Sequence, residues 1–146
     1  MTRNYVGIGC AVLALASVLL GGCGGGTTVT VTMKEFSLVP DRTSAPAGTI
    51  HFVADNKGMD VHELVLLKTD LAHDMLPLDM AGDVDEMAAG ITNVGEVENV
   101  AAGKTGEFSV DAKPGKHVLI CNLAMMEGGM VEHHYTLGMH AAFTVE

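Results

Sequence analysis

Four residues of this sequence carry side chains that together suit a metal ion: His62, Cys121, His134 and Met139. Two neutral imidazoles and a thiolate form a soft set of donors, and a thioether adds a weak fourth. Such a set suits copper, because both the cuprous and the cupric ion accept it. Cysteine-containing zinc sites usually show close Cys-x-x-Cys pairs, and the sequence has none. We therefore expect one copper ion.

Alternating apolar and polar residues predict the elements that position these side chains. The alternation recurs in short stretches separated by Gly and Pro turns, which is typical of an all-β sandwich or barrel. His62 opens one predicted strand, and Cys121 ends another whose two faces are both apolar, which favours a central position. His134 and Met139 lie on the loop before a last predicted strand over 141–146.

The stretch over 69–100 departs from this alternation. Its apolar residues lie among acidic ones: Asp70, Asp74, Asp79, Asp83, Asp85 and Glu86. We predict a long acidic, partly helical connection that lies across the sandwich, with one or two helical turns. The acidic residues lack the ordered spacing of a calcium-binding loop, so we interpret them as a solvated surface.

Taken in order, four segments resemble the cupredoxins, the small blue copper proteins that include plastocyanin, azurin and pseudoazurin. The segments are Ala47-Gly48-Thr49-Ile50-His51-Phe52, His62-Glu63-Leu64-Val65, Cys121-Asn122-Leu123 and His134-Tyr135-Thr136-Leu137-Gly138-Met139. The resemblance covers about residues 29–146, the expected cupredoxin domain. It implies a Greek-key β-sandwich and a type 1 copper ion held by His62, Cys121, His134 and Met139. It also implies that Glu63, whose backbone would bond the cysteine sulfur, and Asn122 surround these ligands.

The loop after the cysteine differs from the family. In the cupredoxins, the second histidine ligand usually follows the cysteine ligand by two to five residues, whereas His134 follows Cys121 by thirteen. Residues 124–133 look like an insertion, which leaves both His133 and His134 as candidate ligands. We prefer His134, because its spacing to Met139 matches the plastocyanin pattern. The insertion contains four residues that could form a hydrophobic docking surface or a second, weak cuprous site: Met125, Met126, Met130 and His133.

Other methionines and histidines have simpler interpretations. Five methionines are expected in the core or covering it: Met33, Met59, Met75, Met80 and Met87. His117 lies on the same strand as Cys121, four residues earlier, and we interpret it as a structural hydrogen-bonding residue near the opposite end.

The N-terminal 22 residues are typical of an export signal. Arg3 precedes an almost unbroken apolar run over 5–20, which is short for a membrane span. The following Leu20-Gly21-Gly22-Cys23 resembles the lipobox of bacterial lipoproteins, in which the cysteine becomes the lipid-bearing first residue. We predict a signal peptide over 1–22, lipidation of Cys23, a flexible tether over 23–28 and an extracytoplasmic, lipid-anchored protein. A retained membrane helix and a plain secretory signal are the alternatives.

Charge narrows the class of partner. The 146 residues include 8 basic and 18 acidic side chains, and removal of 1–22 takes only Arg3 from them, so the net charge goes from −10 to −11. This acidity argues against binding nucleic acid. The resemblance implies redox protein partners, and the acidity predicts that they dock through a basic surface. No catalytic triad or phosphate-binding loop is visible, and the resemblance implies an electron carrier rather than an enzyme. The alternative is a copper-binding protein for storage, delivery or resistance. An oxidase or nitrite reductase fragment ranks last, because the chain lacks His-x-His pairs and a second domain.

Overall fold

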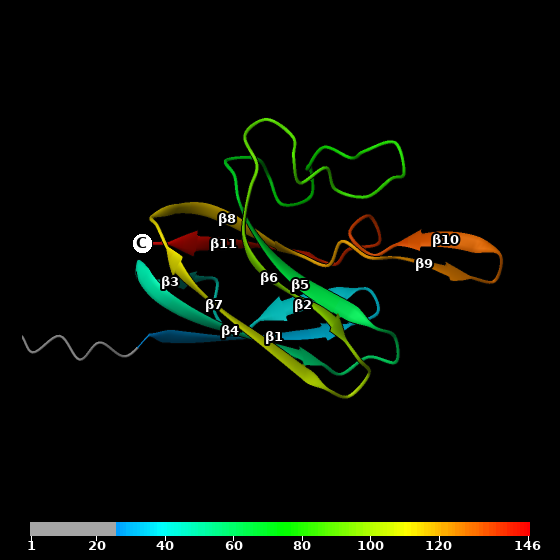
Figure 1. The fold of residues 1–146 in the computed structure, drawn as a ribbon, viewed down its shortest axis with the longest axis horizontal. Coiled ribbons are helices and arrows are strands. Elements are labelled where there is room, and N and C mark those ends of the chain that lie inside the picture. The colour runs from blue at the N-terminus through cyan, green and yellow to red at the C-terminus, as the bar shows by residue number, and fades with distance from the viewer. Residues whose placement is uncertain (1–25) are drawn as a thin grey trace, which may run out of the picture.

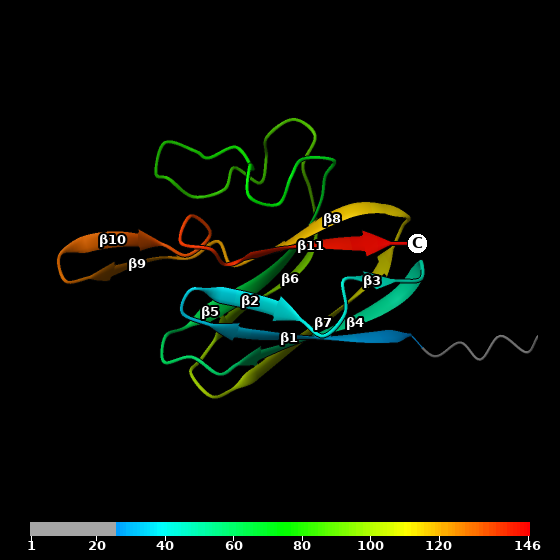
Figure 2. The ribbon, with the colours of Figure 1, turned by 180° about the vertical axis from the view of Figure 1, so that it is seen from behind.

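The fold is that of a computed structural model, which describes residues 26–146. This part of the chain forms two packed β-sheets and a separate hairpin (Figures 1 and 2). The first sheet contains, in spatial order, β2 (Ser37–Pro40), β1 (Thr27–Lys34), β4 (Gly48–Asn56) and β7 (Thr105–Ala112). The second contains β3 (Ser44–Ala45), β11 (His140–Val145), β8 (Gly115–Ile120), β5 (His62–Lys68) and β6 (Thr92–Val100). The hairpin pairs β9 (Ala124–Glu127) with β10 (Met130–His133). The predicted all-β sandwich is confirmed.

Strand β8 lies between β11 and β5, so the predicted central position is confirmed. Its side chains alternate between two apolar clusters because successive residues of a strand point to opposite faces. Leu119 packs in the main core between the sheets, as does Cys121 just beyond the strand. Val118 and Ile120 face the other way, into a second apolar cluster. Both faces of β8 are therefore buried, which holds Cys121 rigidly at the end of the strand.

The second cluster is covered by residues 69–91, the observed connection between β5 and β6. Leu76 and Val84 pack there against Val118, Ile120 and Tyr135. Across this stretch the chain forms turns and bends and a single bridge between Leu78 and Val84, without a helix. The predicted helical turns are therefore wrong, and residues 92–100, which we placed in the same connection, form β6.

The physical reason lies in the residues of this connection. Pro77 interrupts the helix-like apolar spacing, since proline has no N–H to donate within a helix. Asp79 then uses its side chain to accept hydrogen bonds from the backbone N–H groups of Ala81, Gly82 and Asp83, at 2.8, 2.9 and 3.2 Å. Aspartates that bond nearby backbone in this way favour turns over helix interiors.

Different segments of the chain lie at the two ends of the long axis of the molecule. The hairpin β9–β10 projects from one end, whereas β1 begins, and the chain terminates, at the other end (Figure 1). Strand β1 begins at Thr27 rather than at 29, so the last two residues of the predicted tether belong to the sheet. The predicted signal peptide over 1–22 and the lipidated Cys23 lie outside the described residues. Residues 26–146 include no helix of the length and apolarity needed to cross a membrane.

Candidate metal centre

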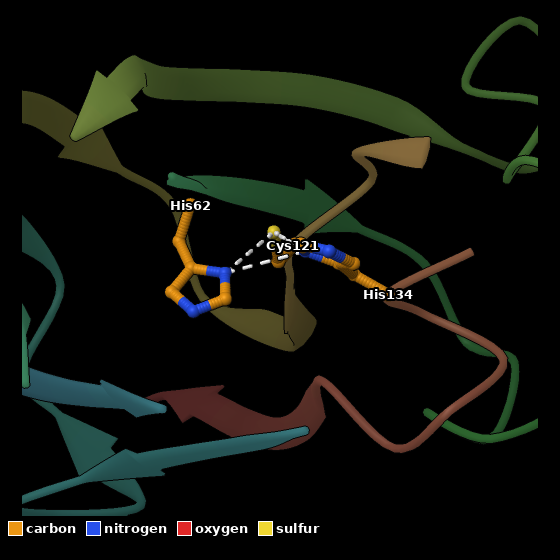
Figure 3. A group of neighbouring side chains, drawn as sticks. All are labelled: His62, Cys121 and His134. Atoms are coloured by element: carbon orange, nitrogen blue, oxygen red, sulfur yellow. Dashed lines mark hydrogen bonds between the residues drawn. The ribbon is translucent and has the colours of Figure 1, made fainter. Parts of the chain in front are cut away.

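Three side chains that are distant in sequence meet at the hairpin end of the sandwich. The Sγ atom of Cys121 lies 3.3 Å from Nδ1 of His134 and 3.9 Å from Nδ1 of His62. The two Nδ1 atoms lie 3.2 Å apart, and the rings point toward each other and the sulfur (Figure 3). At most 1% of any of the three residues is exposed. Within residues 26–146, they form a buried group of donors able to hold a metal ion.

The dimensions of this triangle fit a metal ion. A point equidistant from atoms with these separations lies about 2.0 Å from each one, which is the length of a metal–imidazole bond. A metal–thiolate bond is slightly longer, about 2.3 Å, so an ion would sit marginally farther from the sulfur. The donor set and its spacing therefore suit one soft or borderline metal ion.

His62 is held by the loop that precedes β5. The buried Asn56 side chain donates to the carbonyls of Asp60, at 2.7 Å, and Val100, at 2.8 Å, and accepts from the N–H of Gly58. On the other side of the loop, Glu35 accepts hydrogen bonds from the N–H groups of residues 59 and 60. Those backbone bonds, that of Asp60 first, lower the pKa of Glu35 to about 2, so its carboxyl group is ionised.

Cys121 is held by backbone contacts on both sides. Its N–H donates to the carbonyl of Met139 at 3.0 Å, and the N–H of Glu63 donates to its sulfur at 3.4 Å. The second contact is the one that the family resemblance implied. Burial raises the pKa of the Cys121 thiol to about 11, although the N–H groups of Glu63 and Leu123 oppose this shift. Without a metal the group is a neutral thiol, and metal binding replaces its proton.

His134 and Met139 lie in a tight turn before β11. The N–H of His134 donates to the carbonyl of Leu123 at 2.9 Å, and the N–H of Met139 donates to the carbonyl of His134 at 3.0 Å. The ring of Phe36 packs edge-on against the His134 ring, with 5.7 Å between centroids. Met139 is completely buried, in the same core cluster as Cys121. This turn thus places the predicted fourth donor in the core beside the predicted cysteine ligand.

Glu63 and Asn122 link the centre to the connection over 69–91. The Glu63 carboxylate accepts from the N–H of Asn122 at 2.9 Å. The Asn122 side chain accepts from the N–H of Val84 at 2.7 Å and donates to the Val84 carbonyl and to Glu86, each at 3.0 Å. Partial burial raises the pKa of Glu63 to about 7, and its bond from Asn122 only partly opposes the shift.

The inserted residues form the hairpin, and its register separates the four residues predicted there. Met126 is paired with Val131, and Met125 with Glu132. Because neighbours along a strand face opposite sides, Met126 and His133 share one face, while Met125 and Met130 share the other. His133 lies away from the donor triangle and contacts Asp83, with 2.8 Å between Nδ1 and Oδ1. The residue beside Cys121 is therefore His134 and not His133.

The predictions for His117 and for the methionines outside the site are confirmed in part. His117 is buried and its Nδ1 lies 3.1 Å from the Gly115 carbonyl, so the predicted hydrogen bond is present. Met33 is in the core as expected. Four other methionines are largely exposed, so their placement in or over the core is wrong: Met59, Met75, Met80 and Met87.

Sequence reasoning did not identify three residues that contact the centre or its loop. Glu35 and Phe36 come from the turn between β1 and β2, and Asp83 comes from the connection. Each is a single residue in an irregular segment, so no periodicity marks it. The glycine at 58 is the one indirect signal, since a Cβ there would overlap the Glu35 carboxylate.

The chain is similar in fold to solved blue copper proteins. One is an auracyanin from the photosynthetic bacterium Roseiflexus castenholzii, which is 21% identical over 84% of this chain and 99% of its own, with a TM-score of 0.54. Auracyanin A, described as a blue copper protein of the green thermophilic photosynthetic bacterium Chloroflexus aurantiacus, is 19% identical over 84% of this chain and 100% of its own, at 0.53. The copper protein rusticyanin is 17% identical over 84% of this chain and 80% of its own, with a TM-score of 0.51.

Comparison at the level of sequence gives no further relatives. No model of a known protein family matches the chain, and no curated protein matches it. The likeness therefore rests on the arrangement of the two sheets, together with a buried His/Cys/His cluster at one end of them. The chain has the cupredoxin fold, the Greek-key β-sandwich of the blue copper proteins.

Proposed function

We propose that this chain is an extracytoplasmic copper protein that carries single electrons between redox partners. In this proposal one type 1 copper ion is held by Cys121 Sγ and by Nδ1 of His62 and His134, with the Met139 thioether as a weak fourth donor. The observation that carries the proposal is the buried triangle of two imidazole nitrogens and one sulfur. Two imidazoles, a thiolate and a long thioether bond are the donor set of blue copper electron-transfer sites.

The chain around the site is suited to electron transfer and not to substrate chemistry. Copper supplies the one-electron step by alternating between its cuprous and cupric states. The ligands come from a strand, a strand end and a turn that are fixed by the core, so their positions need change little between the two states. The burial of all three donors supports a carrier over a site that must admit a substrate.

Electrons would leave through the His134 side of the site. That residue is only 1% exposed, so neighbouring groups cover its ring. Phe36 packs on the ring, and the nearby Leu137 is 45% exposed. We propose this thin apolar cover as the place where a partner approaches.

The hairpin supports a partner with both apolar and basic groups. Met126 and Val131, on one of its faces, are 70% and 51% exposed, while Glu127 and Glu132 occupy the other face. The Asp83–His133 contact joins its base to the acidic connection. Such a surface fits a basic protein, whose association with it would weaken as salt screens the charges. Electron transfer to a small basic haem protein should therefore slow as ionic strength rises, and Met126→Gln should slow it more than Met87→Gln.

Membrane attachment through Cys23 is part of the proposal. Because β1 begins at the end opposite the hairpin (Figure 1), a lipid on Cys23 would leave the metal end directed away from the bilayer. More than one acyl chain is needed for lasting attachment. Cys23→Ala should move the protein from the membrane fraction to the soluble extracytoplasmic fraction, and retention in the membrane would contradict the anchor.

The alternative function is copper storage, delivery or resistance through the methionine- and histidine-rich hairpin. The strong exposure of Met126 and Met130, each 70%, favours it. Their position on opposite faces opposes a shared cuprous site. A storage protein would bind several cuprous ions per chain and lose them readily, whereas the carrier binds one tightly.

The test is the visible and paramagnetic resonance spectra of purified protein after addition of one equivalent of cupric ion. We expect an intense thiolate-to-copper charge-transfer band that ascorbate bleaches. Cys121→Ser should abolish the band without unfolding the chain, whereas Met126→Ser should leave it unchanged. A band that survives in Cys121→Ser, or no band in the unaltered protein, would contradict the proposed function.

A further inference from the structure

Glu35 occupies a special position beside the metal centre. Its Oε1 atom accepts two backbone hydrogen bonds, from the N–H of Met59 at 2.6 Å and of Asp60 at 2.8 Å. The carboxylate also lies so close to Gly58 that a Cβ at that residue would overlap it. The side chain is 28% exposed, although the residue stands in a surface turn between β1 and β2. Glu35 is therefore fixed in place by the loop that leads into His62.

The same oxygen lies beside His62, on the side of the ring that faces away from the donor triangle. Oε1 of Glu35 lies 3.4 Å from Nε2 of His62, the nitrogen on the side of the ring away from the donor triangle. That nitrogen is fully buried, and within residues 26–146 it has no well-aligned hydrogen-bond partner. A buried imidazole nitrogen without a partner is costly, so its best available partner is the carboxylate already beside it.

We propose that Glu35 is a positioning residue for the copper site: its carboxylate receives the Nε2–H of His62, turns Nδ1 toward the metal, and stabilises the cupric ion more than the cuprous one. The inference rests on the proposed function. Carboxylates that accept from a metal-bound histidine fix its tautomer and raise its basicity as a ligand. The negative charge adds to this effect, because the cupric ion carries one more positive charge than the cuprous ion.

Glu35→Gln is a sharp test because it removes the charge and keeps the shape. The Gln Oε1 can still accept from Met59 and Asp60, so the loop should stay in place. We expect the cupric affinity to fall roughly ten- to a hundredfold, as for other partners of metal-bound histidines, and the cuprous affinity to fall less. The reduction potential of the variant should therefore be higher than that of the unaltered protein.

Two matched variants separate the contact from general effects. Asp60→Asn removes a charge from the same loop but keeps the backbone N–H that donates to Glu35, and we expect a smaller change in affinity and potential. Glu35→Ala removes the loop bonds as well, so it should also lower the free energy of unfolding. An Asp60→Asn effect equal to that of Glu35→Gln, or a Glu35→Gln protein with unaltered affinities and potential, would overturn the proposal.

A measurement without metal distinguishes this proposal from the proposed function. In the metal-free protein, nitrogen NMR should place the His62 proton on Nε2, and Glu35→Ala should shift the ring toward a mixture of tautomers. A proton on Nδ1 in the unaltered protein would overturn the role of Glu35. If instead the unaltered protein develops no charge-transfer band with copper, the proposed function fails, whatever the tautomer.

Discussion

The Nδ1 atoms of His62 and His134 lie 3.2 Å apart in the core, although 72 residues separate the two histidines in sequence. Both atoms also face the sulfur of Cys121. In the metal-free protein, a proton placed between two of these three atoms forms a hydrogen bond between those two only. A single cation at the centre of the triangle can be bound by all three donors. His133, the immediate neighbour of His134, instead contacts Asp83 outside the triangle.

This difference predicts opposite results for two adjacent alanine substitutions. His134→Ala should abolish the charge-transfer band, because it removes one corner of the donor triangle. His133→Ala should retain the band and lose only its contact with Asp83, at a cost of about 0.5–1.5 kcal/mol in unfolding free energy. Copper titration followed by visible spectroscopy, with urea unfolding in parallel, measures both effects. The reverse pattern of spectra would assign the ligand to His133.

Met139 gives a prediction about the weak fourth donor. Met139→Leu should keep the colour and raise the reduction potential, because loss of the thioether leaves fewer donors for the cupric ion. The swap nearly conserves volume, so its cost in unfolding free energy should stay below about 1.5 kcal/mol. Met33→Leu is the matched control, since Met33 is equally buried in the same core cluster. Equal potentials in the two variants would remove Met139 from the ligand set.

The predictable part of the molecule is the part with regular spacing. The two-residue period around Leu119 and Cys121 predicted a central strand with two buried faces, and the structure has it. Strands convert a period in sequence directly into a side of a sheet, which is why this step succeeded. The donor types of His62, Cys121 and His134, together with the resemblance to the cupredoxins, predicted that these residues meet, and they do.

The irregular segments were less predictable, for physical reasons. In the connection, the apolar spacing of Leu71, Met75 and Leu78 imitates a helix, but Pro77 and the turn formed by Asp79 prevent one. Glu35 contacts His62 across 27 positions from a surface turn, and nothing in its neighbours marks that contact. Side-chain contacts made by single loop residues depend on tertiary structure, which a local pattern does not encode.

We predict that the Asn122 side chain holds the connection over 69–91 against the loop that follows Cys121. Its side chain makes three hydrogen bonds, two with Val84 and one with Glu86. Asn122→Ala should leave the partly buried backbone groups of Val84 without partners and lower the unfolding free energy by about 1–3 kcal/mol. Amide exchange at Val84 should accelerate more than exchange at Leu119 in β8.

The control for this change is Asn93→Ala. Asn93 bonds Glu86 and Glu96 at an exposed site, so its loss should cost less than about 0.5 kcal/mol. Equal losses of stability in the two variants would show that the Asn122 contacts do not hold the connection.

Glu63 predicts a pH dependence of stability in the metal-free protein. Its pKa is raised from 4.5 to about 7, chiefly by burial, so the folded chain holds the proton more tightly than the unfolded chain. The resulting stabilisation is fully present below about pH 4.5, and it is lost as the pH rises to about 7. Glu63→Gln cannot ionise, so relative to the unaltered protein it should gain about 1–2 kcal/mol across this window, a value reduced for the partial exposure of the group.

The difference in unfolding free energy between the unaltered protein and Glu63→Gln isolates the contribution of Glu63. The buried histidines, such as His117, have lowered pKa values and affect stability in the same pH range, but they are common to both chains and cancel. The contribution of Glu35, with its lowered pKa, is lost only as the pH falls below about 4.5. Urea unfolding at pH 4.5, 6 and 8 measures the difference. Parallel curves for the unaltered protein and Glu63→Gln would mean that the Glu63 carboxyl group is solvated in the folded chain.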